Sequence, residues 1–387
     1  MRNARARAPV AAPAFAKGRR ARPKAEGDGP EPSPARARRL ARDLGSWFAL
    51  AARDLPWRRD RRPYAVWISE IMLQQTRVEA VVPYFERFLG DFPDVAALAA
   101  APLDAVLARW AGLGYYRRAR VLHLAAREVT ERFAGELPGD VDRLQSLPGI
   151  GRYTAGAIAS LAFGRRAPLV DGNVARVLAR LFDIAVDAKT PRGARVFWEL
   201  AERLLPEDAP GRFNEALMEL GATVCTPREP RCEACPLSRH CEARKTGRQR
   251  ELPVVAKRAA RPEVALVALV VRAGARVLLA RRPPDGLFGG LWEPPMLEAT
   301  PRAAVATLRA AGLSVTATRC GRVRHVLSHR ELAVEVLRAD VERNEEHAEH
   351  AVVLPGYEAA GWHRAAAPGV GTSSLARKVL RAALGEV

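Results

Sequence analysis

The sequence predicts a multidomain protein in which an all-α domain is followed by a smaller α+β domain. Three observations support this prediction. From about Leu40 to Leu237, apolar residues recur at the 3.6-residue spacing of amphipathic helices, interrupted by short breaks that contain Gly or Pro. Four of the five cysteines then fall within 17 residues. After a basic stretch, runs of β-branched residues follow, which are typical of strands.

The all-α domain divides into about ten helices, which we place between residues 37 and 222. Residues 1–36 form a basic, Pro-rich segment of low complexity, and we expect a disordered arm there. Residues 223–244 form the cysteine loop and residues 245–262 a basic linker. The clearest helical patterns cover residues 37–53, 64–76, 78–89, 95–110, 118–133 and 192–205.

The last part of the chain, residues 263–387, is predicted to be α+β. Two β-branched runs, 264–271 and 276–279, flank Ala273 and Gly274, and this arrangement predicts a hairpin. The other expected elements are a helix at 303–311, a strand at 331–341 and a helix at 373–384.

The charge of the chain points to a polyanionic partner. The formal net charge is +19, and +12 of it remains when the first 38 residues are left out. Nucleic acid is the first candidate and an acidic membrane surface the second. The chain has no run of eighteen apolar residues, so we expect no membrane span. The N-terminal segment lacks the apolar core of a secretory signal, and its prolines disfavour an amphipathic transit peptide.

The most informative short segment is Leu147-Pro148-Gly149-Ile150-Gly151, a turn between two helical patterns. Its two glycines permit positive φ and bring bare backbone close to a partner. The helix that follows presents free N–H groups and a positive dipole end, which together suit a phosphate. Asp171 follows twenty residues later. The alternatives are a structural turn, and a helix N-cap for Asp171.

The cysteine loop has the spacing C-x6-C-x2-C-x5-C and predicts a metal centre in a reducing compartment. Either zinc or a [4Fe–4S] cluster accepts four thiolates. Zinc sites usually pair two CxxC units, and the single unit here favours the cluster, with zinc as the alternative. Cys320 is expected to be a buried apolar residue. The predicted ligands are Cys225, Cys232, Cys235 and Cys241, and four nearby arginines are expected to face phosphate: Arg228, Arg231, Arg239 and Arg244.

The hairpin, the carboxylate and the cysteine spacing, in this order, resemble the helix-hairpin-helix DNA glycosylases that carry an iron–sulfur cluster. Two branches share this plan. The endonuclease III branch carries a lysine nucleophile where this chain has Tyr153, and a tyrosine cannot form a Schiff base with the sugar. The adenine DNA glycosylase branch is similar in its glutamate followed by a double glutamine (Glu70, Gln74, Gln75) and in its GLGYY segment.

The resemblance implies a monofunctional enzyme that hydrolyses the N-glycosidic bond of adenine. Such a reaction uses two carboxyl groups, as glycoside hydrolysis does. The apolar neighbours of Glu70 would raise its pKa, and the resemblance makes it the acid that protonates adenine and later activates water. Asp171 would stabilise the cationic sugar, Asn173 would orient the carboxylates and Tyr153 would form a wall of the pocket. The alternatives are a surface glutamate for Glu70 and an N-cap for Asp171.

A base inside a duplex must be flipped out to react, so other residues must fill the gap. Tyr115 is expected to wedge into the stack, and Gln75 to hold the opposing base with help from Gln74. Tyr115 and Tyr116 are alternatively core aromatics, but three following arginines argue for a loop that faces DNA: Arg117, Arg118 and Arg120. The further expected DNA contacts are Thr76, Leu147, Gly149 and Gly151.

The C-terminal domain vaguely resembles a Nudix fold, through its hairpin and the segment Gly289–Pro295 that follows. Arg309 and Ala310 stand where paired glutamates would bind Mg²⁺, so nucleotide hydrolysis is not expected. The resemblance implies a domain that inspects 8-oxoguanine opposite the adenine. Ser328 and His329, preceded by Leu327, would contact the lesion; a structural role is the alternative for Ser328.

The expected function is therefore removal of adenine mispaired with 8-oxoguanine or guanine in double-stranded DNA during base excision repair, with a [4Fe–4S] cluster as cofactor. An endonuclease III-like glycosylase and lyase for oxidised pyrimidines is the first alternative. A non-catalytic or redox-sensing DNA-binding protein is the second. We expect a monomer in the bacterial cytoplasm, associated with the nucleoid.

Overall fold

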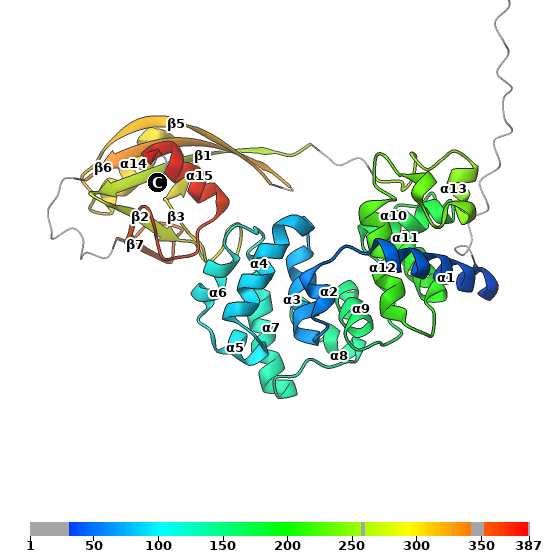
Figure 1. The fold of residues 1–387 in the computed structure, drawn as a ribbon. Coiled ribbons are helices and arrows are strands. Elements are labelled where there is room, and N and C mark those ends of the chain that lie inside the picture. Colours follow the sequence, from blue (N-terminus) through cyan, green and yellow to red (C-terminus); the bar gives the residue numbers. More distant parts are fainter. Residues whose placement is uncertain (1–30, 257–259, 328, 342–351, 386–387) are drawn as a thin grey trace, which may run out of the picture.

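A computed structural model describes residues 31–256, 260–327, 329–341 and 352–385. The expected N-terminal arm falls almost wholly outside these residues, and so does Ser328. No helix in the described ranges is long and apolar enough to cross a membrane. Figure 1 shows a helical domain and a C-terminal domain built on a sheet.

The helical domain contains more helices than the ten expected, because several predicted segments are divided by short breaks. The first helix begins at Pro34, three residues inside the segment expected to be disordered. The helices are α1 (Pro34–Ala51), α2 (Pro56–Arg59), α3 (Pro63–Leu73), α4 (Val78–Asp91), α5 (Val95–Ala100), α6 (Leu103–Trp110), α7 (Arg117–Phe133), α8 (Val141–Gln145), α9 (Arg152–Leu161), α10 (Gly172–Leu181), α11 (Pro191–Leu204) and α12 (Pro210–Thr223). The cysteine loop adds η1 (Cys232–Ala234), η2 (Ser238–His240) and α13 (Glu242–Lys245).

Local sequence explains where many of these helices start. The side chains of Asp94, Asp140 and Thr190 accept hydrogen bonds from backbone N–H groups in the first turns of α5, α8 and α11. Proline occupies the first helical positions of α1, α3, α11 and α12, where the missing N–H costs nothing.

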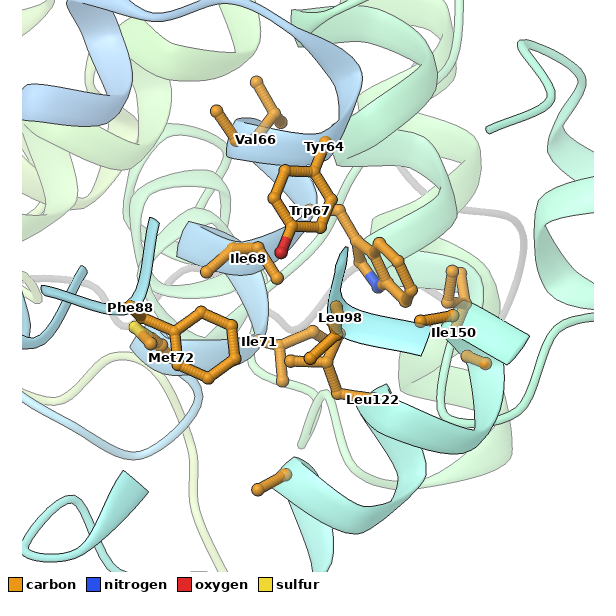
Figure 2. Packing of buried hydrophobic residues seen from close by; sticks show 14 of the residues in the cluster. Tyr64, Val66, Trp67, Ile68, Ile71, Met72, Phe88, Leu98, Leu122 and Ile150 are labelled. Carbon is orange, nitrogen blue, oxygen red and sulfur yellow. The ribbon is translucent and has the colours of Figure 1, made fainter. Parts of the chain in front are cut away.

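The helical domain has two separate cores. The first gathers apolar residues of α2 to α9 around α3, whose residues Tyr64 to Met72 are all buried. Figure 2 shows Trp67, Ile68 and Ile71 of α3 within this core. The second core joins α1 to α10, α11 and α12, so the first helix of the domain packs against the last ones. The two cores therefore meet along a boundary, and the helices beside this boundary are α3, α9, α10 and α12.

The C-terminal domain is a mixed sheet between two helices. Its central strands, β1 (Glu263–Ala273) and β6 (Glu331–Asp340), are parallel, and the path of the sheet is β3-β2-β1-β6-β5. The helices α14 (Pro301–Ala310) and α15 (Ser374–Leu384) pack on opposite faces of the sheet. The remaining strands are β2 (Arg276–Arg281), β3 (Trp292–Glu293), β4 (Met296–Leu297), β5 (Thr316–Val326) and β7 (Ala359–Arg364).

The predicted hairpin is confirmed, because β1 and β2 pair in antiparallel fashion across Ala273 and Arg276. The basic linker is not a free tether in its described part. The buried guanidinium of Arg180 donates to the carbonyl of Leu252, and the N–H of Ala256 donates to Asp187. The chain therefore stays against the second core before it enters the sheet.

Gly156 tests the packing of α9 in the first core. An alanine Cβ at this position would collide with the carbonyl oxygen of Pro168. Because that oxygen belongs to backbone, we expect Gly156→Ala to lower the free energy of unfolding by about 2–3 kcal/mol, measured by chemical denaturation. The control is Gly45→Ala in α1, where nothing lies near the added methyl; it should be neutral or stabilise by up to about 1 kcal/mol. Equal effects of the two substitutions would contradict the packing described here.

Candidate active site

A cleft of about 770 Å³ lies where the two helical cores meet. Glu70 of α3 belongs to the first core's helices, whereas Asp171 precedes α10 of the second core. Most of the residues predicted for chemistry or DNA contact line this one cleft, although they come from separate parts of the chain. They are Glu70, Gln74, Gln75, Thr76, Gly149, Gly151, Tyr153, Asp171 and Asn173.

Glu70 is a buried carboxyl group rather than a surface glutamate. Only 5% of the residue is exposed, and its helix is buried on all sides. The pKa of Glu70 is raised to about 7, mainly by burial; a hydrogen bond from Tyr153 lowers it, and the nearby charges of Asp171 and Glu215 raise it. Glu70 can therefore hold a proton near neutral pH, which an exposed glutamate does not.

Tyr153, in the first turn of α9, interacts electrostatically with both Glu70 and Asp171. Its hydroxyl lies 3.3 Å from Sδ of Met218 and also within hydrogen-bonding reach of Glu70. Burial raises the pKa of this phenol well above its usual value, and the charges of Glu70 and Asp171 add to the effect. Tyr153 is therefore a neutral hydrogen-bonding wall.

Asp171 combines the two interpretations that the sequence left open. One carboxylate oxygen accepts the N–H of Val174 at 2.7 Å and so caps α10. The other accepts Nδ2 of Asn173 at 3.0 Å. Burial raises the pKa of Asp171, whereas these hydrogen bonds favour its charged form. The helix cap thus fixes the direction of a carboxylate that faces the cleft.

The glycine turn between α8 and α9 differs in detail from the prediction. Gly149 adopts the expected left-handed conformation with φ +74°, and an added Cβ would press on Val121. Gly151 has φ −82° and caps α9 without a side chain, so its value lies in leaving the first N–H groups of α9 open. Leu147, predicted as a DNA contact, is 2% exposed, so only its backbone can meet a ligand.

Two further loops hold residues in the left-handed region, which side chains other than glycine adopt rarely. Gln75 has φ +58° and Tyr115 has φ +49°, and Tyr115 is 47% exposed. Tyr116 is buried in the first core, so the two interpretations of this aromatic pair divide between its members. Gln74 meets Thr154 through its amide at 3.5 Å.

The expectation that Arg118 faces DNA is wrong. Its guanidinium donates to the carbonyls of Ile71 and Met72 at 2.8 and 2.9 Å, and to that of Gly114 at 3.1 Å. It also donates to the carbonyl of Gln74 and to the hydroxyl of Thr76. Burial lowers the pKa of Arg118 to about 10. This partly buried arginine links the loop that carries Gln75 to the loop that carries Tyr115.

Sequence reasoning missed a group of buried ion pairs that lines the same cleft. Glu215 and Glu219, one turn apart on α12, are nearly buried and pair with arginines that follow α1. Glu215 lies 2.8 Å from Arg61 and 3.4 Å from Arg58. Glu219 lies 2.9 Å from Arg58 and 2.7 Å from Arg53. The i, i+4 glutamates were the available signal, but their arginine partners lie far away in the sequence.

The four predicted cysteine ligands surround one small cavity of about 30 Å³. Arg180 holds the cysteine loop in place, because its guanidinium donates to the carbonyls of Thr226 and Pro227 at 2.7 and 2.8 Å. Within the described ranges, no three His, Cys, Asp or Glu side chains are arranged to hold a single metal ion.

Hydrogen bonds connect this loop with the cleft. Arg176 of α10 donates to the carbonyl of Cys225 at 2.8 Å and to Oδ1 of Asn173 at 2.9 Å. Asn173 in turn donates to Asp171. The carboxylate that faces the cleft is thus tied, through two side chains, to the backbone of the first cysteine in the loop.

One expectation about the remaining polar residues needs correction, and the arginines of the cysteine loop differ in their contacts. Cys320 is exposed on β5, so it is not a buried apolar residue. Arg231 donates to the carbonyl of Thr223 and Arg244 pairs with Glu233 at 2.8 Å, so these two are engaged within the protein. Arg228 and Arg239 are exposed.

Leu327 and His329, two of the residues considered for reading a lesion, lie between β5 and β6 and do not line the cleft. Leu327 packs against the apolar core on the α15 face, and His329 is exposed. Arg309, at the end of α14, donates to the carbonyl of Val315. It therefore has a structural contact at the position where a Nudix hydrolase would need a carboxylate.

Burial of Glu70 predicts a pH-dependent stability. A carboxyl with a pKa near 7 in the folded chain and near 4.5 when unfolded costs stability as pH rises from 4.5 through 7. We expect Glu70→Gln to remove this cost, so that the variant gains about 3 kcal/mol over the wild type at pH 8 relative to pH 4. Chemical denaturation at both pH values measures it. The matched control is Glu86→Gln on the exposed face of α4, and a Glu70→Gln profile parallel to wild type would refute the burial argument.

Comparison with known proteins agrees with this geometry. Residues 68–203 match the HhH-GPD superfamily of base excision DNA repair proteins, and residues 266–382 match the NUDIX domain. A solved structure of a thermostable thymine-DNA glycosylase has a TM-score of 0.50 and 30% sequence identity, covering 54% of this chain and 97% of that one.

Similar curated proteins include several adenine DNA glycosylases. The human enzyme is 39% identical over 354 residues, covering 75% of this chain and 65% of its own length. The enzyme of Mycolicibacterium smegmatis (strain ATCC 700084 / mc(2)155) is 46% identical over 206 residues, covering 53% of this chain and 69% of its own. The chain thus spans about two thirds of the length of these relatives. It belongs to the adenine DNA glycosylase family.

Proposed function

We propose that this protein is a monofunctional DNA glycosylase that removes adenine mispaired with 8-oxoguanine or guanine in double-stranded DNA. The observation that carries the proposal is the buried carboxyl of Glu70, with its raised pKa, in the same cleft as Asp171. Two carboxyl groups in different environments can serve as an acid and as an ionic stabiliser.

The reaction begins with a proton transfer from Glu70. The carboxyl gives its proton to N7 of the flipped adenine, and the C1′–N9 bond breaks with its electron pair going to N9. The positive charge that develops on C1′ and the ring oxygen lies opposite the Asp171 carboxylate. Water then adds to C1′ and returns its proton to Glu70, which restores the enzyme.

The remaining wall of the cleft has the polar groups needed to recognise a base edge. Arg58 and Glu215 present paired donors and acceptors beside the cleft, and Tyr153 presents a neutral hydroxyl. Asn173 holds the direction of Asp171. Since Tyr153 stands where the bifunctional branch carries a lysine, no covalent Schiff base is expected.

The DNA backbone is proposed to meet the open end of α9 near Gly149 and Gly151, and the DNA stack to meet Gln75 and Tyr115. Thr76 and Gln74 support the Gln75 loop, and the backbone at Leu147 completes the hairpin contact. We further propose that Ser328 and His329 contact 8-oxoguanine from the C-terminal domain.

The domain division follows these roles. Residues 37–222 would hold the chemistry, 223–244 the cluster loop, 245–262 the linker and 263–387 the domain that reads the lesion. We infer a monomer that works on nucleoid DNA in the bacterial cytoplasm; a stable oligomer by light scattering, or a tagged protein excluded from the nucleoid, would contradict this.

The proposed cofactor is a [4Fe–4S] cluster, held by Cys225, Cys232, Cys235 and Cys241. The chemistry of four thiols around one cavity supports it. When bound, the cluster would cross-link the loop and so stabilise the second core through Arg176 and Arg180.

The catalytic proposal is tested by incubating the protein with duplexes that place adenine opposite 8-oxoguanine, guanine or thymine, and cleaving abasic sites with alkali. We expect strand products from the first two duplexes and little from the third. Glu70→Gln, which cannot donate the proton, should reduce the single-turnover rate by at least about a hundredfold. Products that do not depend on Glu70 would exclude the mechanism. Abundant covalent adduct trapped by borohydride would favour the bifunctional alternative.

The cofactor proposal is tested by metal analysis of purified protein. We expect about four irons per chain and a brown colour. Cys235→Ser should lose iron and thermal stability together, whereas Cys320→Ser, outside the loop, should keep both. A colourless wild-type protein that contains stoichiometric zinc would overturn the cluster in favour of zinc.

A further inference from the structure

The C-terminal domain docks onto the helical domain close to the loop that carries Tyr115. Leu291, which follows β2, is fully buried within the first helical core. A Cβ added to Gly371, just before α15, would lie 3.3 Å from both Leu107 of α6 and Leu291. The N–H of Trp292 donates to the carbonyl of Gly371 at 2.9 Å, which joins the two docking segments.

Tyr116 is the hydrogen-bonding centre of this contact. Its buried hydroxyl donates to the carbonyl of Thr372, in the C-terminal domain, at 2.8 Å. The same oxygen accepts the N–H of Gly112 at 3.3 Å. One phenol therefore closes the segment 112–116 upon itself and attaches it to the other domain.

Tyr115 is the neighbour of this phenol, and its backbone has little freedom of its own. Gly112 and Gly114 have φ +115° and +72°, and Tyr115 itself has φ +49°. Arg118 binds the carbonyls of Gly114 and Gln74 at once. A shift of Tyr116 would therefore move Tyr115 directly, and would reach the Gln75 loop through Arg118.

We propose that Tyr116 is a positioning residue through which the C-terminal domain sets the loop that inserts Tyr115 into DNA. This rests on the function proposed above. When the C-terminal domain grips 8-oxoguanine, the Tyr116–Thr372 hydrogen bond holds the insertion loop in register with the lesion. Opposite guanine, which lacks the lesion contact, the hydrogen bond has no such effect on the rate.

Tyr116→Phe tests the proposal with the removal of one oxygen atom, because the ring stays in the core. The matched control is Tyr84→Phe. The Tyr84 hydroxyl donates to the carbonyl of Ala111 at 3.1 Å, so it holds the same segment from inside the helical domain. Single-turnover rates are measured for both variants and wild type on A:8-oxoguanine and A:guanine duplexes, and thermal unfolding confirms the fold.

We expect Tyr116→Phe to slow excision opposite 8-oxoguanine about fivefold, the effect of one buried hydrogen bond, and to change the rate opposite guanine less than twofold. Tyr84→Phe should leave the ratio of the two rates as in wild type. A wild-type ratio in Tyr116→Phe, whether both rates hold or fall together, overturns the inference. Wild-type protein inactive on both duplexes would instead refute the proposed function.

Discussion

The burial of one carboxyl group between two helical cores is the constraint on which the site depends. Glu70 lies on α3, whose residues Tyr64 to Met72 are all buried, so its carboxyl has few solvent contacts to keep it charged. The second core contributes the partner that completes the chemistry, because Asp171 caps α10 and cannot turn away without losing that cap. Any motion between the two cores would change the separation of the two carboxyl groups. Buried ion pairs such as Arg58–Glu219 join the segment after α1 to α12 and restrict this motion. The helix α1 itself packs against α10, α11 and α12.

Arginine side chains hold the loops around the cleft in place. Arg118 donates hydrogen bonds to carbonyls of two loops. Arg176 and Arg180 donate hydrogen bonds to carbonyls of the cysteine loop. These buried or partly buried arginines satisfy carbonyls of loops and of a helix end that have no partner in a helix or sheet. Part of the net charge of +19 is therefore engaged in hydrogen bonds within the protein. The positively charged surface available to DNA is smaller than the composition indicates.

Sequence reasoning predicted the parts of the molecule whose signal is local. The glycine turn, the β1–β2 hairpin and the helical periodicity each depend on neighbouring residues, and they lie where expected. It failed where the partner lies far along the chain. Arg118 looked exposed because only the folded chain brings carbonyls of α3 to it, and the Glu215–Arg58 wall has no local signature. The strand β5, at the edge of the sheet, escaped detection because arginines and a register shift near Gly321 interrupt its apolar alternation.

Asp171 shows why a site residue can look ordinary in sequence, since it is at once a helix cap and a cleft carboxylate.

The central claim is that Glu70 keeps its proton near neutral pH. Carbon-13 NMR of protein labelled at glutamate side-chain carboxyls, with Glu70→Gln to assign the resonance, measures this directly. The account predicts a Glu70 pKa near 7 in the free protein. A Glu70 resonance that titrates near 4.5, as in an exposed glutamate, would contradict it.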